Sequence, residues 1–143
     1  MRVGPRFSAP IARQCPIEHY RRESATQILN SGEMPDYRNP EYLSRRRFAS
    51  YHEQVRIAVS LNLDDILEIG VGNGIFRFVV EGLQRRVTSL DFDLNLKPDV
   101  CASVMAGLPF TSSAFGAVAA FQVLEHVPFH LLEDILNEFG RVS

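Results

Sequence analysis

The strongest constraint on the fold is a short apolar run that ends beside an acid and then breaks into glycines. Residues 66–69 are Ile-Leu-Glu-Ile, and residues 70–74 are Gly-Val-Gly-Asn-Gly. An apolar run of this length bounded by glycines indicates a buried strand followed by a tight turn. A second apolar run, residues 87–90, also leads into an acid, Asp91. The two runs therefore predict neighbouring strands with carboxylates at their ends.

Strand and helix patterns alternate after this point. Helical periodicity over residues 73–86 follows the glycine turn, with two arginines at its end, and further strands are expected at 99–102 and 116–121. The latter is wholly apolar, so we expect it to be buried on both faces. A last helix is expected over residues 129–142. Alternation of this kind predicts an α/β fold with a parallel sheet and right-handed crossovers.

The first part of the chain lacks this alternation. Residues 1–40 are proline-bearing and predict an irregular leader, in which residues 18–29 have the pattern of a short helix. Residues 41–61 predict a helix that presents Tyr42, Phe48, Tyr51, Val55 and Val59 on one face. We expect this helix to cap the sheet or to border a substrate entrance. The chain is therefore divided into a leader, 1–40, and a domain, 41–143.

Composition excludes several classes of protein. Hydrophobic residues make up 45% and charged residues 22% of the chain, which is ordinary for a globular domain. No apolar run reaches the roughly 18 residues of a membrane span, and no signal peptide is visible, so we expect a cytoplasmic protein without a membrane span. The two cysteines are far apart and form no metal-ligand pair, so no metal is expected.

Charge is divided unevenly along the chain. Residues 1–60 hold ten arginines and six acids, a net charge of +4, and residues 61–143 hold five basic residues and eleven acids, a net charge of −6. The arginines at 45–47 suit an anionic partner such as nucleic acid or phospholipid. A solvated helix face is the simpler interpretation, because aromatic residues are not interleaved with the arginines.

The glycine turn has the pattern G-x-G-x-G directly after a strand. A dinucleotide fingerprint would require glycine where Ile75 stands, which argues against a nicotinamide or flavin dinucleotide. A nucleoside lying across two strand ends needs glycines for close approach and a carboxylate for its ribose hydroxyls. The alternative is a tight strand-to-helix turn that holds no ligand.

The two acids have alternative roles. Glu68 lies within an apolar strand, which is costly unless it accepts from the glycine-loop amides or from a cationic ligand group. Asp91 is placed for a ribose diol or, alternatively, for capping the segment that follows it. Asp93 is better suited to that capping role.

The run 68–74, Asp91, Leu108-Pro109-Phe110 and residues 115–127 occur in an order and spacing that resemble a known family. That family is the class I S-adenosylmethionine-dependent methyltransferases, type 11-like. The resemblance covers about residues 62–142. It implies a Rossmann-like, doubly wound parallel sheet in which this chain supplies strand order 3-2-1-4 with flanking helices. It also implies an S-adenosylmethionine site formed by Glu68, Gly70, Gly72, Asn73, Gly74, Asp91, Phe92, Ser103 and Gln122.

The resemblance assigns a role to each of these places. Glu68 and the glycine loop would hold the amino-acid part of the cofactor, and Asp91 the ribose. Phe92 and Ser103 would border the adenine, and Gln122 would lie beside the methionine part. No catalytic residue is assigned, because methyl transfer needs mainly positioning. His126 is a candidate base, but a structural role capping the next helix is equally compatible with its position.

The chain also departs from the family pattern. It lacks the acid that often precedes Leu-Pro-Phe, and Gly116 stands where many members have Asp. The family sheet has seven strands, so the chain is expected to be a truncated methyltransferase or its cofactor-binding half, with an exposed fourth strand that favours self-association. The expected acceptor is a small molecule. The alternatives are a non-catalytic module that needs a partner to complete its sheet, and another Rossmann-like nucleotide binder.

Overall fold

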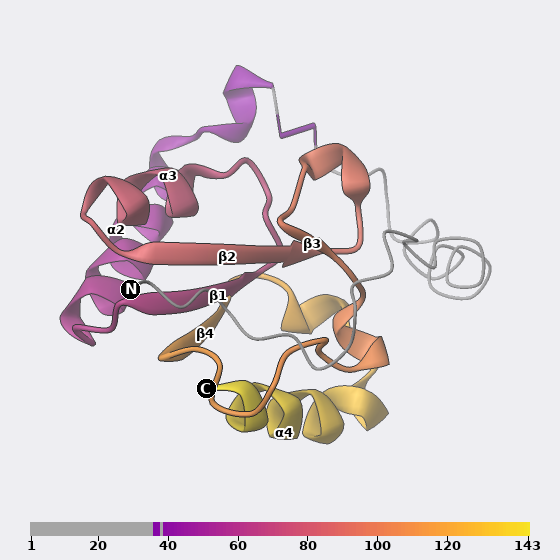
Figure 1. Cartoon of the computed structure of the whole chain (residues 1–143). Coiled ribbons are helices and arrows are strands. Elements are labelled where there is room, and N and C mark those ends of the chain that lie inside the picture. Colours follow the sequence, from indigo (N-terminus) through magenta and orange to yellow (C-terminus); the bar gives the residue numbers. More distant parts are fainter. Residues whose placement is uncertain (1–35, 38) are drawn as a thin grey trace.

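The computed structural model describes residues 36, 37 and 39–143 (Figure 1). Its longer elements, in chain order, are α2 (Arg45–Ser60), β1 (Asp65–Ile69), α3 (Ile75–Gly82), β2 (Arg86–Asp91), β3 (Val100–Cys101), β4 (Ala117–Ala120) and α4 (Leu132–Val142). Single 3-10 turns are found at Pro40–Tyr42, Leu94–Leu96, Val104–Ala106, Leu124–His126 and Phe129–Leu131. The helix expected at residues 18–29 lies outside the described residues.

The four strands form one parallel sheet in the order β3-β2-β1-β4. Ile66 is in register with Val87 of β2 and with Ala117 of β4, so β1 has a neighbour on both edges. This arrangement confirms the predicted Rossmann-like α/β fold and its strand order. Within the described residues no other strand pairs with β4, so self-association through its edge stays a prediction.

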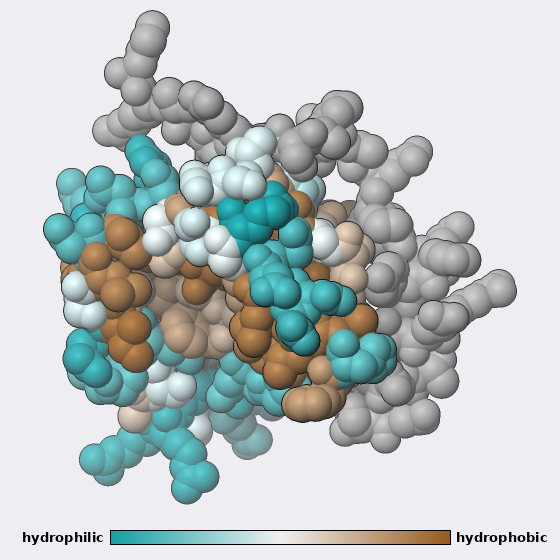
Figure 2. Space-filling view, turned by 90° about the horizontal axis from the view of Figure 1, so that it is seen from below, coloured by the Kyte–Doolittle hydropathy of each residue, from teal (hydrophilic) through white to brown (hydrophobic). Residues whose placement is uncertain are grey.

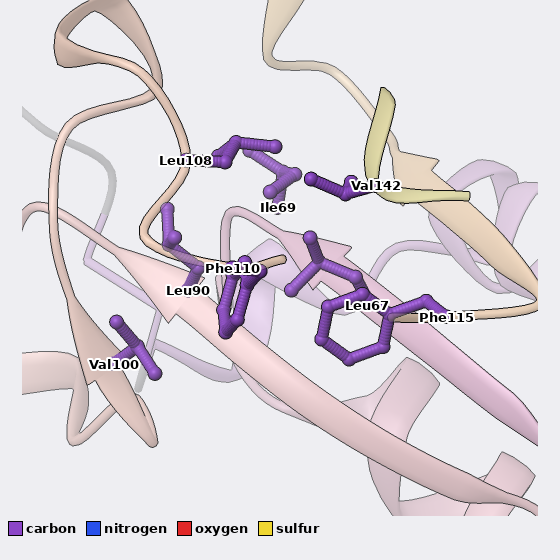
Figure 3. Close-up of a cluster of buried hydrophobic side chains, with 8 residues drawn as sticks. All are labelled: Leu67, Ile69, Leu90, Val100, Leu108, Phe110, Phe115 and Val142. Atoms are coloured by element: carbon purple, nitrogen blue, oxygen red, sulfur yellow. The ribbon is translucent and has the colours of Figure 1, made fainter. Parts of the chain in front are cut away.

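Side chains of β1 pack into two separate hydrophobic cores, because successive side chains of a strand point to opposite faces of the sheet. Leu67 and Ile69 pack with Phe110 and Val142 in a cluster on the side of α4 (Figure 3). Ile66 belongs to the other cluster, whose buried members also come from α2, α3 and β2. The sheet therefore lies between α4 on one face and α2 with α3 on the other (Figure 1).

Three helices are shorter than their sequence patterns predicted. The helix expected at 129–142 begins at Leu132, after the 3-10 turn Phe129–Leu131. The helix expected at 73–86 ends at Gly82, because Gln84 has a left-handed φ of 66° and the Arg86 N–H donates to the Asp64 carbonyl instead of to a helical turn. Arg86 therefore opens β2 and pairs with Asp65. The helix expected at 41–61 begins at Arg45, where the Ser44 hydroxyl caps it.

Two predictions about burial are also wrong. Every residue of β4 is only partly buried, because within the described residues this strand has a neighbour on one edge alone. On the predicted inner face of α2, Tyr51, Val55 and Val59 are partly buried, but Phe48 is 51% exposed, and the buried residues of the helix are Gln54 and Ala58. Tyr51 and Gln54 also line the cavity described below.

Helix α4 holds the Leu-Pro-Phe segment through polar bonds as well as through the core. The Arg141 guanidinium donates to the carbonyls of Phe110 and Leu108, at 2.8 and 3.0 Å, and the Leu108 N–H donates to Glu138, at 2.9 Å. The pKa of Glu138 falls to about 2, mainly because Arg141 hydrogen-bonds its carboxylate. Figure 2, seen from the side of α4, shows hydrophilic side chains beside exposed apolar ones on this face.

Arg141→Leu is expected to lower the free energy of unfolding by about 1 to 3 kcal/mol, because it removes a donor from two carbonyls and from the Glu138 carboxylate. Urea denaturation measures the change. Arg56→Leu is the matched control, since Arg56 contacts only Glu53 in an exposed ion pair. That variant should change stability by less than about 0.5 kcal/mol. Equal losses in the two variants would show that Arg141 does not secure the segment.

Candidate functional site

A cavity of about 450 Å³ lies where β1, β2 and β4 end. The carboxyl ends of parallel strands are the usual ligand position in open α/β sheets. Of the residues predicted for the site, the cavity is lined by Glu68, Gly70, Gly72, Asn73, Asp91, Phe92 and Gln122. Gly74 and Ser103 do not line it. Gly74 precedes α3, and the Ser103 hydroxyl accepts from the Met105 N–H and caps a 3-10 turn.

The glycine loop requires its glycines for two different reasons. Gly70, Gly72 and Gly74 have φ values of 83°, 53° and 74°, in the left-handed region that side chains disfavour. A Cβ at Gly70 would also lie only 2.6 Å from the Val123 side chain. At Gly72 the nearest atom would be a ring carbon of Tyr37 at 3.8 Å, so only the backbone restricts that position.

Asp91 joins the end of β2 to the glycine loop. One of its oxygens accepts from the Val71 N–H at 2.8 Å, and the other accepts from the Asp93 N–H at 2.9 Å. Burial raises the pKa of Asp91, and these two hydrogen bonds oppose the rise. The carboxylate retains lone pairs for further donors. The cap of the next turn is Asp93, which accepts from the Asn95 N–H.

Glu68 and Asn73 each have a buried polar atom without a hydrogen-bond partner among the described residues: Oε2 of Glu68 and Nδ2 of Asn73. Glu68 is 3% exposed, and its burial raises the pKa to about 8, although the charge of Arg77 lowers it in part. The other end of the Asn73 amide accepts from the Ile75 N–H. An unpaired acceptor and an unpaired donor therefore lie beside the same loop.

The cavity wall on the N-terminal side of the domain is formed by Tyr37, Tyr42, Arg47, Tyr51 and Gln54. The sequence predicted that the helix with Tyr42 and Tyr51 could border a substrate entrance, but it did not single out Tyr37, Arg47 or Gln54. Arg47 Nη1 donates to the Tyr42 hydroxyl at 2.6 Å and to Gln122 Oε1 at 3.1 Å. The spacing 47, 51, 54 was the available signal, because these positions share one helix face. This spacing does not stand out in the sequence, because arginine and glutamine side chains on a helix usually face the solvent.

Glu125 and His126 also line the cavity, in the turn that follows β4. Neither 3-10 turn Phe129–Leu131 nor α4 has a side-chain cap, so the alternative role of His126 as a cap of the next helix is wrong. In the described part of the chain, no three His, Cys, Asp or Glu residues are grouped to hold a metal. Likewise, none of its helices is long and apolar enough to cross a membrane.

Comparison with known proteins relates the chain to a protein family. Residues 67–143, just over half of the chain, match a family model described as "Methyltransferase domain". No curated protein and no solved structure matches the chain. The matched range includes the glycine loop, both acids and the cavity residues after β4, but not α2.

The buried Glu68 predicts an unusual pH dependence of stability. Its pKa is about 8 in the folded protein and ordinarily about 4.5, so the folded state keeps a proton that the unfolded chain releases. Stability should therefore fall as pH rises from about 4.5 to 8. Glu68→Gln removes this titration. The free energy of unfolding of the variant, relative to that of wild type, should therefore rise by about 2 to 4 kcal/mol from pH 4.5 to pH 8.5. Urea denaturation of both proteins at several pH values measures this difference. Stabilities of wild type and Glu68→Gln that change in parallel with pH would contradict the prediction.

Proposed function

Because the chain belongs to the methyltransferase-domain family, we propose that it binds S-adenosylmethionine and transfers the methyl group to an acceptor. The observation that carries the proposal is the pair of unpaired buried groups beside the glycine loop, Glu68 Oε2 and Asn73 Nδ2. A buried acceptor and a buried donor without partners are costly in an empty protein. The ammonium and carboxylate of an amino acid would satisfy both.

Glu68 would hold the ammonium group of the cofactor. In the free protein burial keeps its carboxyl largely protonated at neutral pH, since its pKa is about 8. An ammonium nearby favours the ionised form, so binding would release the proton. Asn73 would donate to the carboxylate from the turn where the backbone already approaches closely.

Asp91 and Phe92 would hold the nucleoside. Asp91 is 7% exposed and is kept in place by the Val71 and Asp93 amides, so its remaining lone pairs are already oriented for ribose hydroxyls. The neighbouring Phe92 residue is 51% exposed and lines the cavity, where its ring would pack against a flat base. Ser103 caps a turn outside the cavity lining, so its proposed adenine contact would be indirect.

The bound cofactor supplies a methyl group on a positively charged sulfur, which an oriented nucleophile can accept directly. The chain's own contribution is to position the two reactants and to shield them from water. Gln122, after β4, would lie at the methionine end, beside Glu125 and His126. We assign no general base, and we propose a small molecule as acceptor because the cavity is enclosed on its N-terminal side by α2.

Asp91→Ala should weaken binding of S-adenosylhomocysteine by roughly 1.5 to 3 kcal/mol in isothermal calorimetry, because the ribose hydroxyls lose their acceptor. The sharper measurement compares adenosine with 2′,3′-dideoxyadenosine. Wild type should prefer adenosine, and Asp91→Ala should lose that preference. Asp93→Ala, the adjacent cap, is the control and should retain it. Preference of the wild type for NAD over S-adenosylhomocysteine would refute the proposed cofactor.

Gly72→Val should abolish cofactor binding while leaving the fold largely intact. A β-branched residue at φ 53° is strained, and its side chain would occupy the approach to the loop backbone. Circular dichroism reports folding, and calorimetry with S-adenosylhomocysteine reports binding. Gly140→Ala, a change with open space around it in α4, should bind as wild type. Tight binding by folded Gly72→Val would make the turn purely structural.

A further inference from the structure

Arg47 places a partly buried positive charge in the cavity wall without an acid beside it. Five other arginines of the described residues form ion pairs with carboxylates, namely Arg56, Arg77, Arg85, Arg86 and Arg141. No carboxylate of the described residues lies within ion-pair distance of Arg47, and no other arginine lines the cavity. Its charge is therefore available to a ligand.

The guanidinium is fixed in place, yet much of its donor capacity is unused. Its Cζ lies 3.8 Å from the centre of the Tyr42 ring, a cation–π contact, and Nη1 donates to Tyr42 and Gln122. Nε and Nη2 donate to no described residue. Arginine presents these two groups as a planar fork that matches a carboxylate. The contacts to Tyr42 and Gln122 orient that fork before a ligand arrives.

The tyrosines around Arg47 do not neutralise it. Burial is the main cause that raises the pKa of Tyr42 to about 12, and burial likewise raises the pKa of Tyr37. Both phenols are therefore uncharged at neutral pH. Their rings meet edge to face, 5.1 Å apart, so they supply apolar walls that lower the local dielectric and strengthen the field of Arg47.

Helix stability does not explain a charge at this position. Arg47 lies in the first turn of α2, which contains no acid and three arginines, Arg45, Arg46 and Arg47. The start of a helix carries a partial positive charge, so cations there are unfavourable. Arg45 and Arg46 are exposed to solvent, whereas Arg47 turns toward the cavity. The helix start and the guanidinium therefore add to one positive potential at the same wall.

We propose that Arg47 forms a carboxylate-binding subsite inside the cavity that Glu68 and Asp91 also line. The identity of the carboxylate rests on the proposed function: it belongs either to the amino-acid end of the cofactor or to the methyl acceptor. In both cases Nε and Nη2 donate to the carboxylate while Nη1 keeps its bonds to Tyr42 and Gln122.

The test compares Arg47→Met with Arg46→Met, which removes the same charge from the same helix turn but outside the cavity. The ligands are S-adenosylhomocysteine and 5′-methylthioadenosine, which lacks the amino-acid carboxylate, and calorimetry gives their affinities. Loss of at least tenfold for S-adenosylhomocysteine in Arg47→Met, with 5′-methylthioadenosine unchanged, assigns the subsite to the cofactor. Unchanged binding of 5′-methylthioadenosine also shows that the variant is folded.

A second arm tests the acceptor. Benzoate, a carboxylate on a flat ring, is titrated into wild type already saturated with S-adenosylhomocysteine. If Arg47→Met leaves S-adenosylhomocysteine affinity unchanged but weakens benzoate at least tenfold, the subsite belongs to the acceptor. The inference is overturned if Arg47→Met changes neither affinity, or if Arg46→Met changes them equally. Wild type that binds neither nucleoside would instead refute the proposed function, and benzoate binding to the free protein would then test Arg47 independently.

Discussion

The hydrogen bond from the Val71 N–H to the Asp91 carboxylate joins the ends of the two central strands, and the site depends on it. β1 and β2 are paired over five positions, so their ends are held at one edge of the sheet. The glycine loop leaves that edge with three left-handed residues, a conformation that needs an external tie. Asp91 provides this tie because it is buried at the neighbouring strand end, and the loop amides and Asn73 are consequently oriented toward one cavity.

The ionisable groups that line the cavity differ in their burial and in the contacts that hold them. Glu68 is deeply buried and largely protonated at neutral pH, burial raises the pKa of Asp91 while its backbone hydrogen bonds oppose the rise, and the Arg47 guanidinium is held by an aromatic ring. A ligand with both an ammonium and a carboxylate matches this set of groups, whereas a simple anion or a simple cation matches only part of it. The distribution of charge therefore supports the proposed cofactor, which carries both groups.

The cavity is built from two parts of the chain with different constraints. The floor of the cavity is formed by residues at the ends of β1, β2 and β4. Sheet register and the two hydrophobic cores determine the positions of these strand ends. The wall comes from α2 and from Tyr37 and Tyr42, and it is joined to the floor mainly by polar and aromatic contacts such as Arg47 to Gln122. The family match covers the floor and not this wall, which is where differences in ligand selection would be expected.

The sequence by itself determined the sheet, its strand order through the family resemblance, and the floor of the cavity. Local signals sufficed there: apolar runs bounded by glycines define buried strands, and parallel strands bring their ends to one edge. Sequence did not determine where helices end, how far β4 is buried, or that Gln54 of α2 is buried against the cavity, because long-range pairing decides each of these. Only the tertiary structure brought Arg47 and three tyrosines over the glycine loop, since Arg47 and Gln122 meet across 75 positions of the chain. Contacts of that separation leave no periodic trace in the sequence.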